Sequence, residues 1–194
     1  MEIIKKTVYL ILIFFPINLY SQVREKKAIE LTPKIGYSTF KYYASGFPSG
    51  KLNSINFGVT GDYYFNQIWS IQTGILYQKM GGKTFYDKFQ IEYINLPINA
   101  NWHFGSKRNW NFNIGMTTSF RLNDSESQSI LGAKIKNIQS GFNIGTGYKI
   151  EVSKRIGILI DYQFFSGATG LDQDEIYVIT NKGGNLNIGT VFKL

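Results

Sequence analysis

The chain has 194 residues, a formal net charge of +8 and no cysteine. This length suits one domain, and the absence of cysteine excludes disulfides and thiolate chemistry. The basic residues are scattered and form no stripe, so we expect no nucleic-acid partner and relate the charge to anionic lipid headgroups. The 15 Phe, 13 Tyr, 3 Trp and 20 Gly residues, against only 4 Pro, are typical of a β-barrel with aromatic girdles.

Residues 1–21 are predicted to be a signal peptide. Lys5 and Lys6 precede an almost wholly apolar stretch, 7–20, and Ser21 is a small residue suited to cleavage. The apolar stretch is too short for a spanning helix, although a retained membrane anchor is the alternative. Residues 22–29 are charged and do not alternate, so we expect a flexible N-terminal segment before a barrel at 30–194.

The barrel is predicted from eight runs in which apolar and polar residues alternate. They cover 30–40, 55–65, 69–78, 93–104, 110–117, 138–150, 155–164 and 186–194. A period of two places the apolar residues on one face of a strand and the polar residues on the other. Each run has about the ten residues that a tilted strand needs to cross a bilayer.

The polar face of these runs consists mostly of Gly, Asn, Ser, Thr and Gln. A soluble sandwich would show many Lys and Glu residues on a face exposed to water. Small neutral side chains suit the crowded interior of a narrow barrel, which side chains fill. The sequence therefore predicts an all-β fold, an eight-stranded antiparallel up-and-down transmembrane β-barrel in the outer membrane with a polar interior.

The connections between the runs alternate in length. Those at 66–67, 105–109 and 152–154 are short, and those at 41–52, 81–90, 122–136 and 167–184 are long. With the N-terminus in the periplasm, the short turns are periplasmic and the long loops external. The aromatic residues then form two bands, with Trp69, Trp102 and Trp110 beside the short turns, and Tyr37, Phe40, Tyr77, Phe120 and Phe164 at the external interface.

The sequence assigns no catalytic, cofactor-binding or metal-binding residue. The single histidine, His103, is expected to be a hydrogen-bonded interior residue near the periplasmic end, far from the external lipid-facing rim where a lipid hydrolase would act. Asp172, Asp174 and Glu175 could hold Ca²⁺, but they lack EF-hand spacing and are predicted to form a solvated acidic loop.

The polar phase also carries charges of both signs, which are predicted to pair across the interior and to block conduction. They are Lys34, Asp62, Glu92, Arg121, Lys149, Glu151, Arg155, Asp161 and Lys193. Gly145 and Gly147 are expected to make room for interior side chains or to let the sheet curve. The external stretches 42–48 and 83–88 mix aromatic residues with lysines, which suits either contact with a protein or glycan partner or anchoring at an anionic leaflet.

Five segments resemble the PorT-type outer-membrane β-barrel proteins of Bacteroidetes, and the resemblance extends over the whole mature chain. They are 33–38 (PKIGYS), 61–65 (GDYYF), 69–77 (WSIQTGILY), 81–83 (GGK) and 93–98 (YINLPI). The resemblance implies a small barrel of the OmpA-like size class. It also implies a link to protein secretion by the type IX route, with no catalytic motif to carry over.

We therefore expect a non-enzymatic outer-membrane protein with a structural or accessory role at the cell envelope. It would contact lipid, and protein partners through its external loops or periplasmic turns. A barrel that binds or passes a small solute is the alternative. A soluble lipocalin-like binder and an outer-membrane enzyme follow, the first because an eight-stranded barrel can enclose one ligand.

Overall fold

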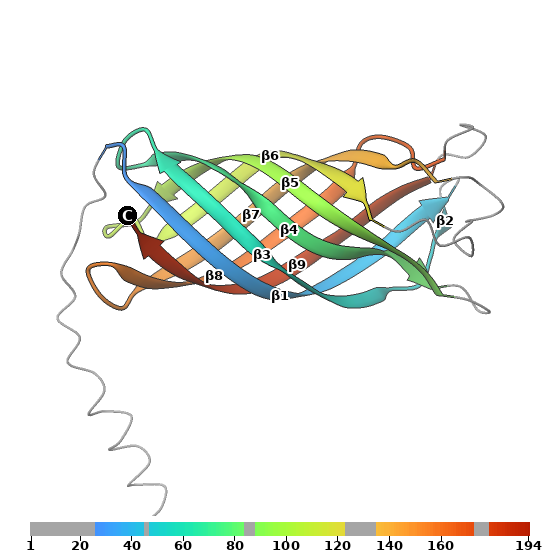
Figure 1. Cartoon of the computed structure of the whole chain (residues 1–194), viewed down its shortest axis with the longest axis horizontal. Helices are drawn as coiled ribbons and strands as arrows, with labels where there is room; N and C mark the ends of the chain where they lie inside the picture. Colours follow the sequence, from blue (N-terminus) through green and yellow to red (C-terminus); the bar gives the residue numbers. More distant parts are fainter. Residues whose placement is uncertain (1–25, 45–46, 84–87, 123–134, 173–178) are drawn as a thin grey trace, which may run out of the picture.

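The computed structural model describes residues 26–44, 47–83, 88–122, 135–172 and 179–194. The predicted signal peptide, 1–21, lies outside these residues, as do 22–25 of the N-terminal segment. The described residues form eight long antiparallel strands that close into a β-barrel (Figure 1). The strands are β1 (Ile29–Ala44), β3 (Leu52–Tyr64), β4 (Trp69–Lys83), β5 (Lys88–Phe104), β6 (Trp110–Arg121), β7 (Ile138–Glu151), β8 (Ile156–Gly167) and β9 (Ile179–Lys193). The predicted fold class is confirmed.

A further short strand, β2 (Phe47–Pro48), extends the end of β1. It pairs Tyr43 with Pro48 and Ala44 with Phe47. The Ser49 hydroxyl accepts a hydrogen bond of 3.1 Å from the Tyr42 backbone N–H, which ties the end of this hairpin back to β1. β2 lies at the end of the barrel opposite the short turns (Figure 1).

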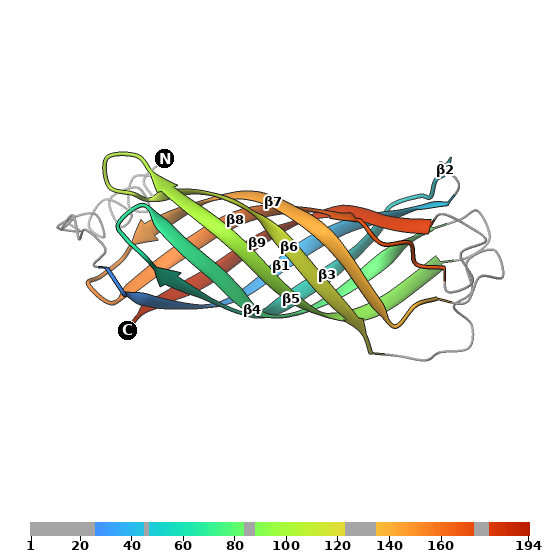
Figure 2. The same ribbon diagram turned by 90° about the horizontal axis from the view of Figure 1, so that it is seen from above.

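The eight long strands follow one another around the barrel in chain order, and β9 pairs with β1 to close it. The closing register runs from Glu30 opposite Lys193 to Ala44 opposite Ile179. Figure 2 shows that the strands are strongly tilted against the long axis of the barrel. Because closure removes the sheet edges, the backbone N–H and C=O groups find partners without water, as a hydrocarbon environment requires.

Side chains that cap backbone N–H groups fix two of the three short turns. The Asn66 Oδ1 atom accepts hydrogen bonds of 2.9 Å from the N–H groups of Ile68 and Trp69. The Ser153 hydroxyl accepts one of 3.1 Å from the N–H of Ile156. Such local caps make the turns tight, and the C-terminus lies at this same end (Figure 1).

The outer surface of the barrel is an apolar belt. Ile75, Ile98 and Ile114 point outward and are 61%, 60% and 59% exposed. A surface of this kind around the whole barrel would be unstable in water and is stable in lipid. The described residues contain no helix that could span a membrane.

The predicted tryptophan band lies where the short turns begin. Trp69 pairs directly with Trp102, and all three tryptophans are 42–48% exposed on the outer face. Phe104 stacks on Trp102 with ring centroids 4.9 Å apart, and Trp110 contacts Tyr148 at 4.7 Å. These rings mark the periplasmic membrane interface, because an indole ring meets both hydrocarbon and water there.

The strands are longer than the predicted runs, with 12 to 17 residues each. In their external parts the polarity of the two faces is inverted. On β5, Ile94 and Leu96 point outward, whereas Tyr93, Ile91 and Phe89 lie in the interior. We call this inverted part the collar. It comprises 39–44 of β1, 79–83 of β4, 88–93 of β5 and 179–184 of β9, with Ile135, Phe165 and Leu171.

The interior of the collar is a hydrophobic core of its own. Its buried members are Phe40, Tyr42, Ala44, Met80, Phe89, Ile91, Tyr93, Ile135, Phe165, Leu171 and Ile179. Two of them come from the connections beyond the strands: the Leu171 N–H donates a 2.8 Å hydrogen bond to the Ile179 carbonyl, and Ile135 forms a β-bridge with Asp172. Apolar residues inside and polar residues outside indicate that the collar stands in water above the membrane.

The collar corrects several sequence predictions. Phe40 was expected at the external lipid interface and Tyr42 in an external loop, but both side chains are buried in the collar core. The predicted loops 41–52 and 81–90 are largely strand. The interior is therefore mostly apolar in the collar, although Asn181 is also buried there and donates to Gln139. Above the membrane the outer face meets water, and the apolar phase turns inward.

The collar core is expected to contribute more to stability than the lipid-facing belt. Replacing Ile91, which is fully buried, by alanine should lower the free energy of unfolding by about 2–5 kcal/mol because it opens a cavity. The matched control is Ile98→Ala on the same strand, where the side chain is 60% exposed to lipid and the loss should be clearly smaller. Urea unfolding in vesicles measures both, and equal losses would contradict a packed collar.

Candidate functional site

The candidate site is the interior of the barrel, which has three levels between its ends. The periplasmic level is ionic. The Lys149 ammonium lies 2.5 and 2.8 Å from the two Glu30 carboxylate oxygens, and the Tyr64 hydroxyl donates to the same carboxylate at 2.9 Å. Glu151 lies 3.5 Å from Lys149 and also pairs with Lys193. These groups join β1, β3, β7 and β9 across the interior, which closes the periplasmic end.

A second cluster at this level contains His103. Its Nε2 atom lies 2.9 Å from the Ser70 hydroxyl, which donates to Asp62 at 3.0 Å. Asp62 also accepts from Gln72 at 3.0 Å and from Asn101 at 2.6 Å. The position predicted for His103, buried, hydrogen-bonded and near the periplasmic end, agrees with the structure.

The order of these three groups differs from that of a catalytic triad. Since the Ser70 hydroxyl gives its one proton to Asp62, it accepts the proton of His103 Nε2. A triad needs the opposite arrangement, with the histidine between the acid and the serine and its Nε2 free to take the serine proton. The cluster holds a buried carboxylate in place.

The middle level is built of amides around one ion pair. Lys34 lies 3.1 Å from Asp161, both buried, and Asn187 donates to the other carboxylate oxygen at 2.5 Å. Asn56 donates to Asn187 at 2.8 Å, and this bond passes over Gly36. A Cβ atom on Gly36 would lie only 2.1 Å from the Asn187 side chain, so the contact requires glycine.

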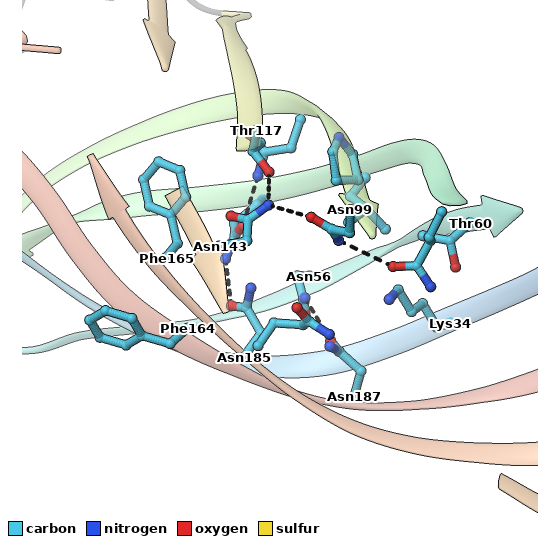
Figure 3. A pocket seen from close by; sticks show the side chains of 16 residues that line it. Lys34, Asn56, Thr60, Asn99, Thr117, Asn143, Phe164, Phe165, Asn185 and Asn187 are labelled. Atoms are coloured by element: carbon cyan, nitrogen blue, oxygen red, sulfur yellow. Dashed lines mark hydrogen bonds between the residues drawn. The ribbon is translucent and has the colours of Figure 1, made fainter. Parts of the chain in front are cut away.

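Further amides in the middle level form two more hydrogen-bonded groups (Figure 3). Gln78 donates to Asn185 at 2.5 Å and accepts from Asn95 at 2.7 Å. Asn143 donates to Asn99 at 3.2 Å and also to Thr117. The network leaves a cavity of about 40 Å³, whose wall includes Lys34, Leu76 and Phe165 besides the amides. That volume holds about three water molecules at most.

Buried acceptors face this cavity without a protein partner. They are Asn56 Oδ1, Thr60 Oγ1 and Asn95 Oδ1. Amide and hydroxyl oxygens of this kind are suited to receiving hydrogen bonds from water or from a hydroxyl group of a very small solute. At its external end the cavity meets Phe165 of the collar core, so the third level, which is apolar, separates it from the outside.

Most of the predicted interior charges form pairs across the interior, as expected. Lys34, Asp161, Lys149, Glu151 and Lys193 form ion pairs, and Asp62 is held by neutral donors. Arg121 lies on the inward phase of β6, opposite Tyr93 at the collar. Glu30, which opens the first run, is an interior charge that the prediction did not include. Its inward phase follows from the alternation of Leu31 and Thr32 beside it.

Two predicted interior charges lie elsewhere. Glu92 is on the outer face of the collar, where it pairs with Lys79 at 2.9 Å, because the polarity of β5 inverts between Tyr93 and Ile94. Arg155 is exposed at the periplasmic rim, because it belongs to the turn before β8. Gly145 lies directly beneath the Gln163 side chain, which confirms that it makes room in the interior.

The acidic external loop is described only in part. Asp172 is buried, whereas Asp174 and Glu175 lie outside the described residues. Within the described ranges, no three His, Asp or Glu side chains come close enough together to hold a metal ion.

A closed eight-stranded barrel with an apolar belt, an aromatic band and short turns at one end defines an outer-membrane β-barrel protein. Residues 20–166 match the model of the outer membrane protein beta-barrel domain family. The chain belongs to this family and resides in the outer membrane, in contact with its lipid. No curated protein matches the chain.

Solved structures share the fold at low sequence identity. OprG from Pseudomonas aeruginosa has a TM-score of 0.56 at 11% identity, over 89% of this chain and 99% of that one. The N-terminal barrel domain of OprF from the same organism has a TM-score of 0.53 at 12% identity, over 88% and 100%. Neisserial surface protein A has 0.54 at 14% identity, over 84% and 97%. These likenesses support the architecture alone.

The ionic level gives a prediction about stability. Lys149→Met leaves the buried Glu30 carboxylate without its ammonium, so the free energy of unfolding should fall by about 3–5 kcal/mol. The double variant Glu30→Gln with Lys149→Met removes both charges and should recover most of this loss. Unfolding in vesicles, followed by tryptophan fluorescence, measures each variant.

The matched control for this prediction is Lys193→Met at the same level. Lys193 also pairs with a glutamate, but its side chain is 17% exposed, against 4% for Lys149, so its loss should cost clearly less than that of Lys149. An equal loss of unfolding free energy for Lys149→Met and Lys193→Met would show that the burial of the Lys149 pair does not increase its contribution to stability.

Proposed function

We propose that this protein is a non-enzymatic, closed barrel with a structural or accessory role at the cell envelope. The observation that carries the proposal is the filling of the interior from end to end. Ion pairs close the periplasmic level, an amide network fills the middle, and the collar core occupies the external level. A protein built in this way acts through its ends and its outer surface.

The ends are the parts that can meet partners. Residues 1–21 would direct the chain to the periplasm as a cleaved signal peptide, which places the short turns there and the collar outside. The connections that follow β1, β4, β6 and β8 begin at the external end, beside the collar. The collar thus offers a firm base for contact with another envelope protein or a glycan.

The filled interior predicts that the purified protein conducts little or no ionic current. The cavity of about 40 Å³ is bounded by the collar core on one side and by charged pairs on the other. Planar-bilayer recordings of the folded protein should show no large, steady conductance. Folding of the same sample is verified by its faster migration on a gel before boiling, and a steady current from that sample would overturn the proposal.

A small-solute barrel is the second candidate, favoured by the unpartnered amide and hydroxyl oxygens at the cavity. The volume of the cavity limits such a solute to a few non-hydrogen atoms. Swelling of proteoliposomes in glycerol and in a disaccharide would separate the two functions. Swelling in glycerol no faster than that of protein-free liposomes supports a closed barrel, and swelling faster than in those liposomes supports solute passage.

A link to protein secretion rests on the resemblance to the PorT-type proteins. The segments 33–38 and 93–98 that carry it lie on β1 and β5 of the barrel wall. We therefore expect deletion of the gene to alter the proteins found in the medium without making the cells generally leaky. Protein analysis of the medium measures the first effect, and sensitivity to a detergent measures the second. Unchanged secretion with leaky cells would favour a purely structural role.

A further inference from the structure

Two lysines lie directly opposite each other on the outer face of the collar. Lys41 of β1 pairs in register with Lys182 of β9, and both belong to the outward phase of their strands. Side chains that face each other across an antiparallel pair are about 4.5–5.5 Å apart at their Cβ atoms, and like charges there destabilise the sheet. The closing seam of the barrel therefore carries an unfavourable pair at its external end.

No described acidic side chain neutralises this pair. The collar has other lysines on its outer face, but Lys79 is neutralised by Glu92 at 2.9 Å. Lys182 instead lies over the ring of Tyr43, with its ammonium 5.0 Å from the ring centroid. A cation–π contact positions an ammonium group without cancelling its charge. Among the described residues, the two charges therefore have no acidic partner.

The height of the pair coincides with the external edge of the membrane. Tyr37 and Leu186, which pair with each other four residues below Lys41 and Lys182, are 55% and 56% exposed and belong to the apolar belt. The Tyr162 hydroxyl reaches up from the belt to Gly184, where a Cβ atom would lie 2.3 Å from it. A tyrosine hydroxyl that points out of an apolar belt marks the interface. Lys182 is two residues further out, at the level of the headgroups.

We propose that Lys41 and Lys182 form a binding site for the phosphate group of an anionic outer-leaflet lipid, with Tyr43 positioning one of the two ammonium groups. One phosphate between the two ammonium groups relieves their repulsion through charge-assisted hydrogen bonds. The lipid chains then lie along the apolar belt beneath, next to Tyr37 and Leu186. The proposal does not depend on the function proposed above.

A lipid titration tests the site. The full chain, purified in detergent, is titrated with phosphatidylglycerol, and bound lipid is counted by native mass spectrometry. Replacing both residues, Lys41→Gln with Lys182→Gln, should weaken binding about fivefold for each lysine removed. The charge-conserving pair Lys41→Arg with Lys182→Arg should keep the affinity. Unchanged binding by the glutamine variant would overturn the proposal.

The matched control removes two exposed lysines at the periplasmic end, Lys26→Gln with Lys107→Gln. It changes the net charge equally, so an equal loss of lipid in this variant would show general surface attraction and overturn a specific site. Inorganic phosphate identifies the source of the anion. If phosphate at the same concentration displaces the lipid, the site takes a free anion and the lipid assignment is wrong.

A measurement of melting temperature tests the same proposal by the direction of the change in stability. In vesicles of phosphatidylcholine, the Lys41→Gln with Lys182→Gln variant should melt at the same temperature as the parent or higher, because the repulsion is gone. In vesicles that contain phosphatidylglycerol, the parent should gain stability and the variant should gain less. A variant that melts lower than the parent in both lipids would show that the lysines serve only the packing of the collar, which contradicts the site.

Discussion

The pairing of β9 with β1 is the constraint on which the rest of the molecule depends. In hydrocarbon, a sheet edge would leave a row of backbone groups without partners, so the strands must close. Eight strands make a narrow barrel, and its interior must then be filled by side chains. The amide network, the glycine beneath the Asn56–Asn187 hydrogen bond and the crossing ion pairs all follow from that limited diameter.

The surroundings of the barrel decide which phase of each strand is apolar. Between the tryptophan band and Tyr37, lipid surrounds the barrel and the outward phase is apolar. Above Tyr37, water surrounds it, and the outward phase becomes polar while the inward phase becomes apolar. The register of β5 against β4 is the same on both sides of this change, with Trp102 opposite Trp69 and Lys88 opposite Lys83. One closed sheet thus contains a membrane part and a part built like a soluble barrel.

The membrane part could be predicted from the sequence because alternation, short turns and tryptophans are local signals. The inversion was missed because alternation alone does not say which phase is inside. Its signals were two pairs of adjacent apolar residues, Tyr93–Ile94 and Phe164–Phe165, at which the apolar phase changes sides. The partners of the interior charges could not be predicted from local sequence signals. Glu30 and Lys149 are 119 residues apart, and whether they come into contact depends on the stagger of the strands.

The collar also separates the part of the chain whose sequence can vary, the external connections, from the part whose sequence is constrained, the membrane part. The collar core lies between the external connections and the membrane part. Substitutions in the connections therefore affect packing first at collar residues such as Leu171 and Ile135. The amide network and the ion pairs below are then shielded from whatever the connections become. In such a barrel, the sequence of the external connections can change while the membrane part keeps its structure.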